Sequence, residues 1–279
     1  MSALNNKIDF TVIFSVNKAN PNGDPLDGNR PRVDYDGMGE VSDVCIKRKI
    51  RNRLQDMGEH IFVQSDERSD DGCRSLRERA DACAELKAIK KDNVKYAETA
   101  CREWMDVRSF GQVFAFKGVD VSVGVRGPVT VQTAVSVMPI ESESIQITKS
   151  VNSETKDKKA SDTMGMKHRV GFAVYRFNGS INVQLAEKTG FSEEDAEKIH
   201  EAIKTLFEND CSSARPEGSM EILKVFWWKH NCKSGQYASA KVHRTVTIDA
   251  TGDGKSVEDY TINYKPLEGL DVDIYDGLQ

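Results

Sequence analysis

NKANPNGDPLDGNRPRVDYDGMGE (residues 17–40) leads directly into VSDVCIKRKIRNRLQDM (residues 41–57), and these two segments organise the rest of the sequence. The glycines and prolines of the first segment predict a long, turn-rich loop. The second segment predicts an α-helix. Five cations, at positions 47, 48, 49, 51 and 53, fall within seven residues of a chain whose formal net charge is -5. We therefore expect a local basic surface on an acidic protein.

Helical periodicity separates the apolar from the charged side chains of residues 41–57. Four apolar side chains share one stripe that we expect to be buried: Ile46, Ile50, Leu54 and Met57. Three cations point roughly the opposite way, so burial of the stripe should display them: Lys47, Arg48 and Arg51. Lys49 and Arg53 lie nearer the apolar side and should form ion pairs or extend along the surface.

The start of this helix has the features of a phosphate-binding site. Ser42 or Asp43 is suited to the N-cap position, which leaves backbone amides beside the loop. Helix N-termini and guanidinium groups both bind phosphate. The alternative is an ordinary amphipathic helix with a solvated charged face. The loop favours a functional role, because long connections without secondary structure are uncommon inside compact domains.

Composition limits the class of protein. The 279 residues allow one large domain or two small ones, and 38% hydrophobic residues with a mean hydropathy of -0.53 can still form a core. We find no long apolar run, and MSALNNKIDF at the start lacks the apolar region of a signal peptide, so we expect no membrane span and a cytoplasmic protein. Six scattered cysteines without a CxxC pair indicate reduced, buried thiols.

Strand and helix signals alternate along the chain. Residues 8–16 alternate apolar and polar side chains and predict a half-buried strand, and residues 60–104 predict a helical insertion with its own small apolar face (Leu76, Ala80, Cys83, Leu86 and Ile89). Strand patterns return at residues 113–137, interrupted at Gly127-Pro128. Residues 144–152 and 166–183 flank a polar tip at 153–165, which predicts either a projecting hairpin or a disordered surface loop.

The last third of the chain completes the pattern. Ser192 and Asp195 have the spacing of a capping box and open a helix whose buried face is Ala196, Ile199, Ile203, Leu206 and Phe207. Residues 221–230, 242–248 and 259–264 predict further strands. The order of elements predicts an α+β fold with helices on an antiparallel sheet, of the split βαβ type.

Signals for catalysis are weak. The histidines lie in no known catalytic motif, His230 and Cys232 lack the second pair that a zinc site needs, and DATGDG (249–254) places Tyr260 where a calcium loop needs glutamate. Aspartates of the loop could bind a metal or act as a base, but such residues usually cap backbone amides. We predict no catalytic residue, no metal and no cofactor.

Several motifs together resemble one family. They are NPNGDPLDGNRPR (20–32), SDVCIKRKIRN (42–52), DVRSFGQVFA (106–115), VRGPV (125–129) and TMGMKHRVGFAVYRFNGSINV (163–183). This combination resembles the type I-C CRISPR Cascade backbone subunit, in the Csd-two-like branch of the Cas seven family. The resemblance spans most of the chain and is least diagnostic around residues 66–91.

The resemblance implies a hand-shaped protein. Its palm would be a modified RNA-recognition-motif (ferredoxin-like) fold formed by residues 1–58, 105–140 and 171–279. A helical finger insertion would span residues 59–104, and a β-hairpin thumb residues 141–170. Many copies would polymerise head to tail along one CRISPR RNA (crRNA) and hold its spacer open for pairing with target DNA, beside a subunit that caps or processes the 5' end, a large subunit and a small subunit.

The resemblance also implies which residues bind RNA. The backbone would be gripped by Ser42, Lys47, Arg48 and Arg51, with Asn22, Arg30 and Arg32 nearby in the loop. Lys167, His168 and Arg169 would lie at the base of the thumb, and Met164 or Met166 would displace a base at regular intervals.

The chemistry of the basic helix agrees with this role. A guide must be held by its phosphates and sugars so that its base edges stay free, and no aromatic residue interrupts the cations at positions 47–53. The acidic net charge is compatible with RNA binding in a filament, where each copy needs only one basic face. Two alternatives remain: a metal-dependent ribonuclease that uses Asp34 or Asp36, and a protein–protein scaffold whose cations bind an acidic partner.

Overall fold

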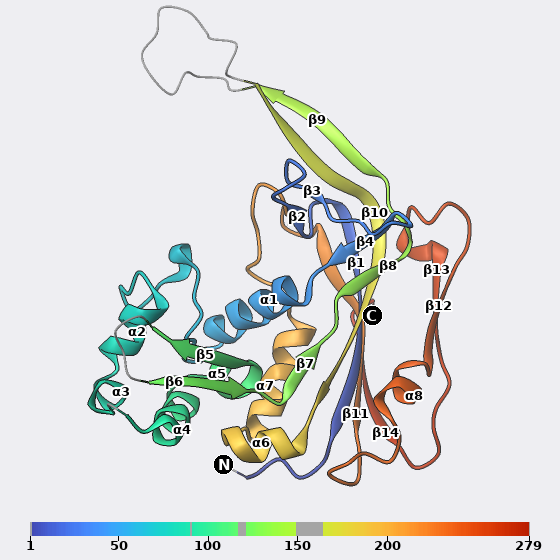
Figure 1. Ribbon diagram of the computed structural model, residues 1–279. Helices are drawn as coiled ribbons and strands as arrows, with labels where there is room; N and C mark the ends of the chain where they lie inside the picture. Colours follow the sequence, from blue (N-terminus) through green and yellow to red (C-terminus); the bar gives the residue numbers. More distant parts are fainter. Residues whose placement is uncertain (1, 90, 117–120, 149–163, 279) are drawn as a thin grey trace, which may run out of the picture.

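An antiparallel sheet forms the centre of the computed structural model, which describes residues 2–89, 91–116, 121–148 and 164–278 (Figure 1). Neighbouring strands follow the order β14-β11-β1-β10-β8-β4, and β7 and β9 also pair with β10. The strands are β1 (Ile8–Ala19), β4 (Met38–Val41), β7 (Val129–Val131), β8 (Ala134–Pro139), β9 (Ser142–Thr148), β10 (Met164–Ile181), β11 (Met220–Lys229) and β14 (Asp271–Asp276). The predicted combination of helices with a large antiparallel sheet is confirmed.

Strand β1 lies between β10 and β11 and is buried on both faces. The prediction of a half-buried strand is therefore wrong. Its apolar face packs under helices, and its other face, which includes Asp9 and Ile13, is covered by a second layer. Inside the protein, Asp9 Oδ2 lies 2.8 Å from His230 Nε2 and 3.1 Å from Lys7 Nζ, whereas Oδ1 is buried without a hydrogen-bond partner among the described residues.

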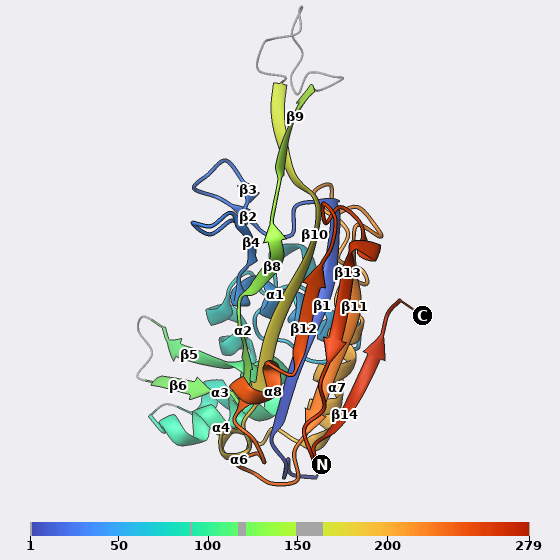
Figure 2. The same ribbon diagram turned by 90° about the vertical axis from the view of Figure 1, so that its right-hand side faces the viewer.

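Helices cover one face of the sheet, and a small hairpin layer covers the other (Figures 1 and 2). The helical side contains α1 (Asp43–Asp56), α6 (Val183–Thr189) and α7 (Glu193–Lys204), and α7 begins with the predicted capping box of Ser192 and Asp195. The other layer contains α8 (Ser239–His243), β12 (Val246–Ala250), a short 3-10 turn η3 (Val257–Asp259) and β13 (Tyr260–Tyr264).

Three elements in the later part of the chain differ from the prediction. Residues 242 and 243 belong to α8 rather than to a strand, because the preceding backbone is already turning as a helix. The edge strand β14 and helix α6 were missed, since their short segments carry weak periodicity.

A second apolar cluster lies apart from the central one, as predicted for residues 60–104. It joins α2 (Leu76–Ala82), α3 (Ala84–Ala88), α4 (Asn93–Glu103) and α5 (Met105–Phe110) with the hairpin β5 (Gly111–Ala115) and β6 (Ser122–Arg126), while the short η1 (Asp66–Arg68) buries no residue. Phe62, Trp104 and Phe114 form its aromatic centre, with Phe62 and Trp104 ring centroids 4.6 Å apart. Gly127 and Pro128 separate β6 from β7, where the sequence indicated a break.

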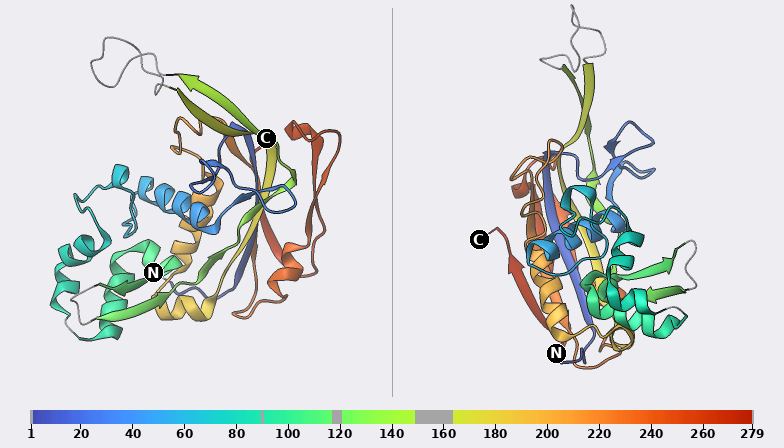
Figure 3. Two further views of the ribbon diagram at one scale, coloured as in Figure 1. Left: turned by 45° about the horizontal axis from the view of Figure 1, so that its top comes forward. Right: turned by 90° about the vertical axis from the view of Figure 1, so that its left-hand side faces the viewer.

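Strands β9 and β10 extend beyond the sheet as a projecting antiparallel arm, which both views of Figure 3 show standing clear of the body. The hairpin prediction is confirmed for the paired residues, from Ser142↔Val170 to Thr148↔Met164. Most of the predicted polar tip lies outside the described residues. Near the foot of the arm, β10 passes the loop that precedes α1.

The cysteines are less buried than predicted. All six lie among the described residues as free thiols, but only Cys101 is buried, while Cys211 and Cys232 are exposed. In the part of the chain that the structure describes, no helix is long and apolar enough to cross a membrane.

Candidate nucleic-acid interface

The loop before α1 is an ordered, turn-rich segment rather than a structureless connection. Strands β2 (Gly23–Asp24) and β3 (Arg30–Pro31) pair within it, and the turn between them passes through Gly28 and Asn29, both with positive φ (57° and 61°). The Asp24 carboxylate accepts a hydrogen bond from the Leu26 amide at 3.0 Å. Carboxylates that cap amides hold the loop, as the sequence suggested.

Asn22 and Ser42 tie the loop to the start of α1. Asn22 Oδ1 accepts from both the backbone amide and the hydroxyl of Ser42, each at 3.0 Å. The Ser42 Oγ accepts from the Cys45 amide at 3.2 Å, so Ser42 is the N-cap. Both side chains are committed to this junction. Their contribution is therefore to position the loop against the helix end.

Two loop arginines reach solvent. Arg30 lies 2.9 Å from the Asp27 carboxylate, and its side chain is 46% exposed. Arg32 lies 3.5 Å from the Asp24 carboxylate with 37% exposure. Ion pairs at such exposed positions are weak and exchange readily with other anions. Arg30 and Arg32 can therefore exchange their carboxylate partners for a phosphate with little loss of free energy.

The cations on α1 are held inside the fold more than predicted. Lys47 pairs with Asp43 at 3.0 Å and is 24% exposed. Arg48 Nη1 donates to the Val63 carbonyl at 2.5 Å, and burial lowers the pKa of its guanidinium. The expectation that burying the apolar stripe would display these cations freely is wrong.

Arg51 is the most firmly held of the three. Its Nε donates to Asp106 Oδ2 at 2.9 Å, and its guanidinium stacks over the Phe110 ring at 4.9 Å. Asp106 also accepts from the amides of Phe62 at 2.7 Å and Val63 at 3.1 Å. The side chains of Arg51 and Asp106 are only 12% and 1% exposed. This network fastens α1 to α5 and to residues 61–63, and the sequence pattern did not identify Asp106 as its centre.

Lys49 and Arg53 form ion pairs on the apolar side, as predicted. Lys49 is buried against Asp210, which also receives Arg215 Nε at 3.0 Å. Burial lowers the pKa of Lys49, while the Asp210 carboxylate opposes that shift. Arg53 donates to Thr205 Oγ1 at 2.8 Å and pairs with Glu208. Two cations of the basic run thus hold α1 onto neighbouring segments.

The arm presents a different set of side chains. Met164 and Met166 are 54% and 55% exposed, and the alternation of β10 places them on one face. His168 is buried, with Nδ1 2.8 Å from Ser144 Oγ, and Arg169 pairs with Glu143 at 2.7 Å. Lys167, which precedes them in β10, is half-buried. His168 is therefore a cross-strand packing residue, and the two methionines are the most exposed of these five side chains.

Of the two aspartates considered for metal chemistry, Asp34 caps the turn, and the Asp36 carboxylate forms no hydrogen bond or ion pair with the residues that the structure describes. Asp34 Oδ1 accepts from the amides of Asp36 at 2.9 Å and Met38 at 2.8 Å. Asp36 is exposed at the tip of the turn. Within the described ranges, no three His, Cys, Asp or Glu side chains converge as a metal site.

Comparison with known proteins assigns this chain to a family. The family model "CRISPR-associated protein Cas7" matches residues 6–265. A CRISPR-associated protein Cas7 from Haloferax volcanii is 24% identical over 282 residues, which cover 94% of this chain and 82% of that protein. A chain of a solved CRISPR RNA-guided surveillance complex, in a pre-nicking state, shares the fold with a TM-score of 0.52 at 17% identity, over 84% of this chain and 81% of that chain.

Proposed function

The chain belongs to the CRISPR-associated protein Cas7 family, and we propose that it is the non-catalytic, crRNA-binding backbone subunit of a type I-C surveillance complex. The observation that carries this proposal is the family match over residues 6–265, nearly the whole chain. Copies would line up along one crRNA in the cytoplasm and present its spacer to the target DNA strand.

The distribution of cations supports a grip on the RNA backbone. Arg30 and Arg32 in the loop and Lys47 on α1 all reach solvent from one region of the chain. A guide must be held by its phosphates so that its bases stay free to pair. We assign direct contacts to these three cations and a positioning role to Asn22 and Ser42.

Arg48 and Arg51 have a double role in this proposal. Each uses one edge of its guanidinium inside the fold, toward Val63 and Asp106 respectively. A guanidinium has five N–H donors, so donors remain for a phosphate oxygen. Their fixed positions would lower the entropy lost when RNA binds.

In this proposal the arm of β9 and β10 contacts the bases of the guide next to the segment that the loop and α1 hold. Its exposed Met164 and Met166 are apolar and flexible, which fits a wedge between bases, and Lys167 and Arg169 lie at its foot with the buried His168. In this proposal β9 and β10 form the thumb (141–170), residues 59–104 the finger insertion, and residues 1–58, 105–140 and 171–279 an RNA-recognition-motif-like palm.

Assembly would use heterologous contacts between copies. A head-to-tail contact that does not close produces an open helical filament, which matches a subunit that repeats along a linear guide. The 5'-end subunit, large subunit and small subunit of the complex would bind the ends and flank of that filament. A single copy should then bind RNA weakly and the filament tightly.

Co-expression of the protein with its CRISPR array tests the proposal. We expect the purified assembly to show the absorbance ratio of a ribonucleoprotein, and to fall apart into small species after ribonuclease treatment. RNA extracted from it should match array transcripts. Purification of a nucleic-acid-free oligomer that resists ribonuclease would instead favour the scaffold function, in which the cations bind an acidic partner.

The ribonuclease alternative makes a different prediction. Asp34 already caps two amides, and Asp36 stands alone at the turn, so we expect no cleavage when the assembled protein meets complementary RNA and Mg²⁺. Gel analysis of end-labelled RNA would measure this. Cleavage at regular intervals that disappears in Asp34→Ala or Asp36→Ala, while Asp27→Ala still cuts, would establish a nuclease.

A further inference from the structure

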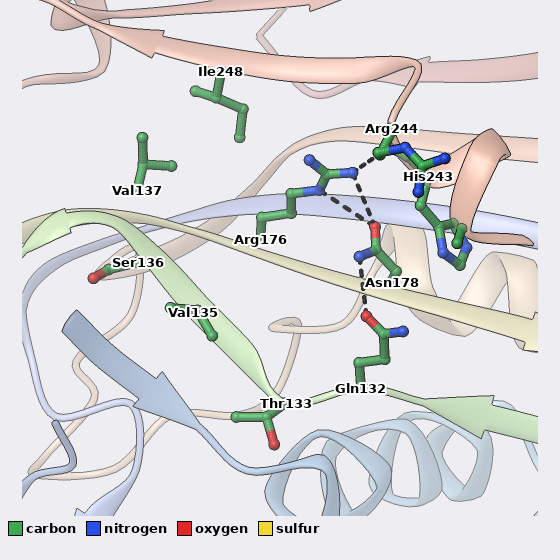
Figure 4. A pocket seen from close by; sticks show the side chains of 11 residues that line it. Gln132, Thr133, Val135, Ser136, Val137, Arg176, Asn178, His243, Arg244 and Ile248 are labelled. Atoms are coloured by element: carbon green, nitrogen blue, oxygen red, sulfur yellow. Dashed lines mark hydrogen bonds between the residues drawn. The ribbon is translucent and has the colours of Figure 1, made fainter. Parts of the chain in front are cut away.

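A cavity of about 560 Å³ lies on the face of the sheet away from α1, between β8, β10 and the α8–β12 segment (Figure 4). Arg176 lines it from β10 and pairs in register with Ile13, which packs in the second layer. Its neighbour Tyr175 points to the central cluster under the helices. The cavity is therefore on the opposite face of the sheet from the loop and helix proposed to hold the guide.

A chain of hydrogen bonds fixes the polar floor of the cavity (Figure 4). Arg176 Nη1 donates to the Val246 carbonyl at 2.9 Å, and its Nε donates to Asn178 Oδ1 at 3.3 Å. Asn178 Nδ2 donates to Gln132 Oε1 at 3.1 Å. The side-chain oxygen of Gln132 therefore already accepts a hydrogen bond. The side-chain NH₂ group of Gln132 makes none within the described part of the chain. Because Gln132 is exposed, this NH₂ group can donate hydrogen bonds to a ligand.

The charge of the cavity is positive. None of the lining residues is acidic, and two of them are arginines, Arg176 and Arg244. Neither arginine forms an ion pair with any described residue, and Arg244 is exposed. Burial alone lowers the pKa of Arg176, without an opposing carboxylate. The buried acid Asp9 lies behind the lining residue His243, with Oδ1 4.0 Å from His243 Nε2, and its other oxygen is held by His230 and Lys7. A concave site lined by one sign of charge concentrates the opposite ion.

The other end of the cavity is apolar. Val137 and Ile248 lie together there in Figure 4, away from Gln132 and Asn178. The volume lies within the range of small-molecule sites, roughly 300–1,000 Å³. One carboxylate side chain would leave most of this space empty. A ligand with an anionic end and a flat, largely apolar end fits the arrangement.

We propose that this cavity binds one nucleotide of a single-stranded nucleic acid, with its phosphate at Arg244, Arg176 and the Gln132 amide and its base against Val137 and Ile248. The site is separate from the guide-binding region and does not depend on it. Hydrogen-bond donors at one end recognise the phosphate without reading sequence. Val137 and Ile248 would contact the base through van der Waals packing.

Photo-crosslinking tests this site directly. The purified protein would be irradiated with a twelve-nucleotide RNA containing 4-thiouridine and, in a second arm, with a DNA of the same length containing 4-thiothymidine. We expect mass spectrometry to place crosslinks in residues 132–137 or 240–248. Arg244→Glu should weaken binding about tenfold and lower the salt slope by about 0.7. Arg126→Glu, on the distant β6, is the matched control and should leave the crosslink unchanged.

Three results would overturn the proposal. Crosslinks confined to other segments would show that the cavity is not a nucleotide site. If the Arg244→Glu and Arg126→Glu variants bound the oligonucleotide with equal affinity, the positive charge of Arg244 in the cavity would have no role in binding. Loss of self-association in Arg244→Glu, with oligonucleotide binding intact, would show that an acidic segment of another copy fills it. Guide RNA that co-purifies with Arg244→Glu would report separately on the proposed backbone function.

Discussion

Replacing Asp106 with alanine should lower the free energy of unfolding by about 3–5 kcal/mol, the cost typical of breaking a buried ion pair from one side. The carboxylate is 1% exposed and accepts from Arg51 Nε and from the amides of Phe62 and Val63. Alanine would leave a nearly buried guanidinium and two backbone donors without partners. Denaturant unfolding followed by circular dichroism measures the change.

Two further variants separate the causes. Asp106→Asn keeps an acceptor for the amides but removes the charge that faces Arg51, so we expect an intermediate loss. Asp36→Ala removes an exposed carboxylate from the loop and should stay within about 0.5 kcal/mol of the unchanged protein. If Asp106→Ala unfolded at the same denaturant concentration as Asp36→Ala, the network would not be what holds α1 to α5.

The local features of α1 could be predicted from the sequence, but the partners of its charged side chains could not. Its N-cap, Ser42, was one of the two candidates that local capping preferences offered, and its buried stripe of Ile46, Ile50 and Leu54 was predicted from the period of the helix. The surroundings of its cations were not. Arg51 meets Asp106 and Lys49 meets Asp210, partners 55 and 161 residues away. Helical periodicity contains no information about contacts at that separation.

For strand β1, likewise, the sequence pattern identified the element but not its surroundings. Alternation at residues 8–16 identified the strand, but a pattern of period two cannot tell whether its polar face meets water or a second layer. Here Asp9 is buried because His230 and Lys7 approach it from the far end of the chain and from the preceding turn. The sequence pattern also could not indicate the cavity lined by Arg176 and Arg244, because its walls come from three separate segments of the chain.

Neutralising Arg30, Arg32 and Lys47 together should abolish retention of guide RNA at physiological salt while the protein stays folded. All three side chains are at least 24% exposed, and their partners Asp27, Asp24 and Asp43 are themselves solvated. Losing three phosphate contacts should lower the slope of log K against log salt by about 2 for single-stranded RNA and weaken binding on the order of a hundredfold. Filter binding of crRNA over a salt series measures both quantities.

The matched control removes the same charge elsewhere. Arg102, Lys188 and Lys233 are exposed cations outside the loop and α1, and their triple alanine variant should bind guide RNA like the unchanged protein. Equal salt slopes for the two triple variants would contradict the proposed interface. Arg48 and Arg51 are left intact here because their bonds to Val63 and Asp106 hold α1 in place. A variant that removed them would lose RNA through misplacement of the helix as well as through lost contacts, and only the solvent-reaching cations separate binding from folding.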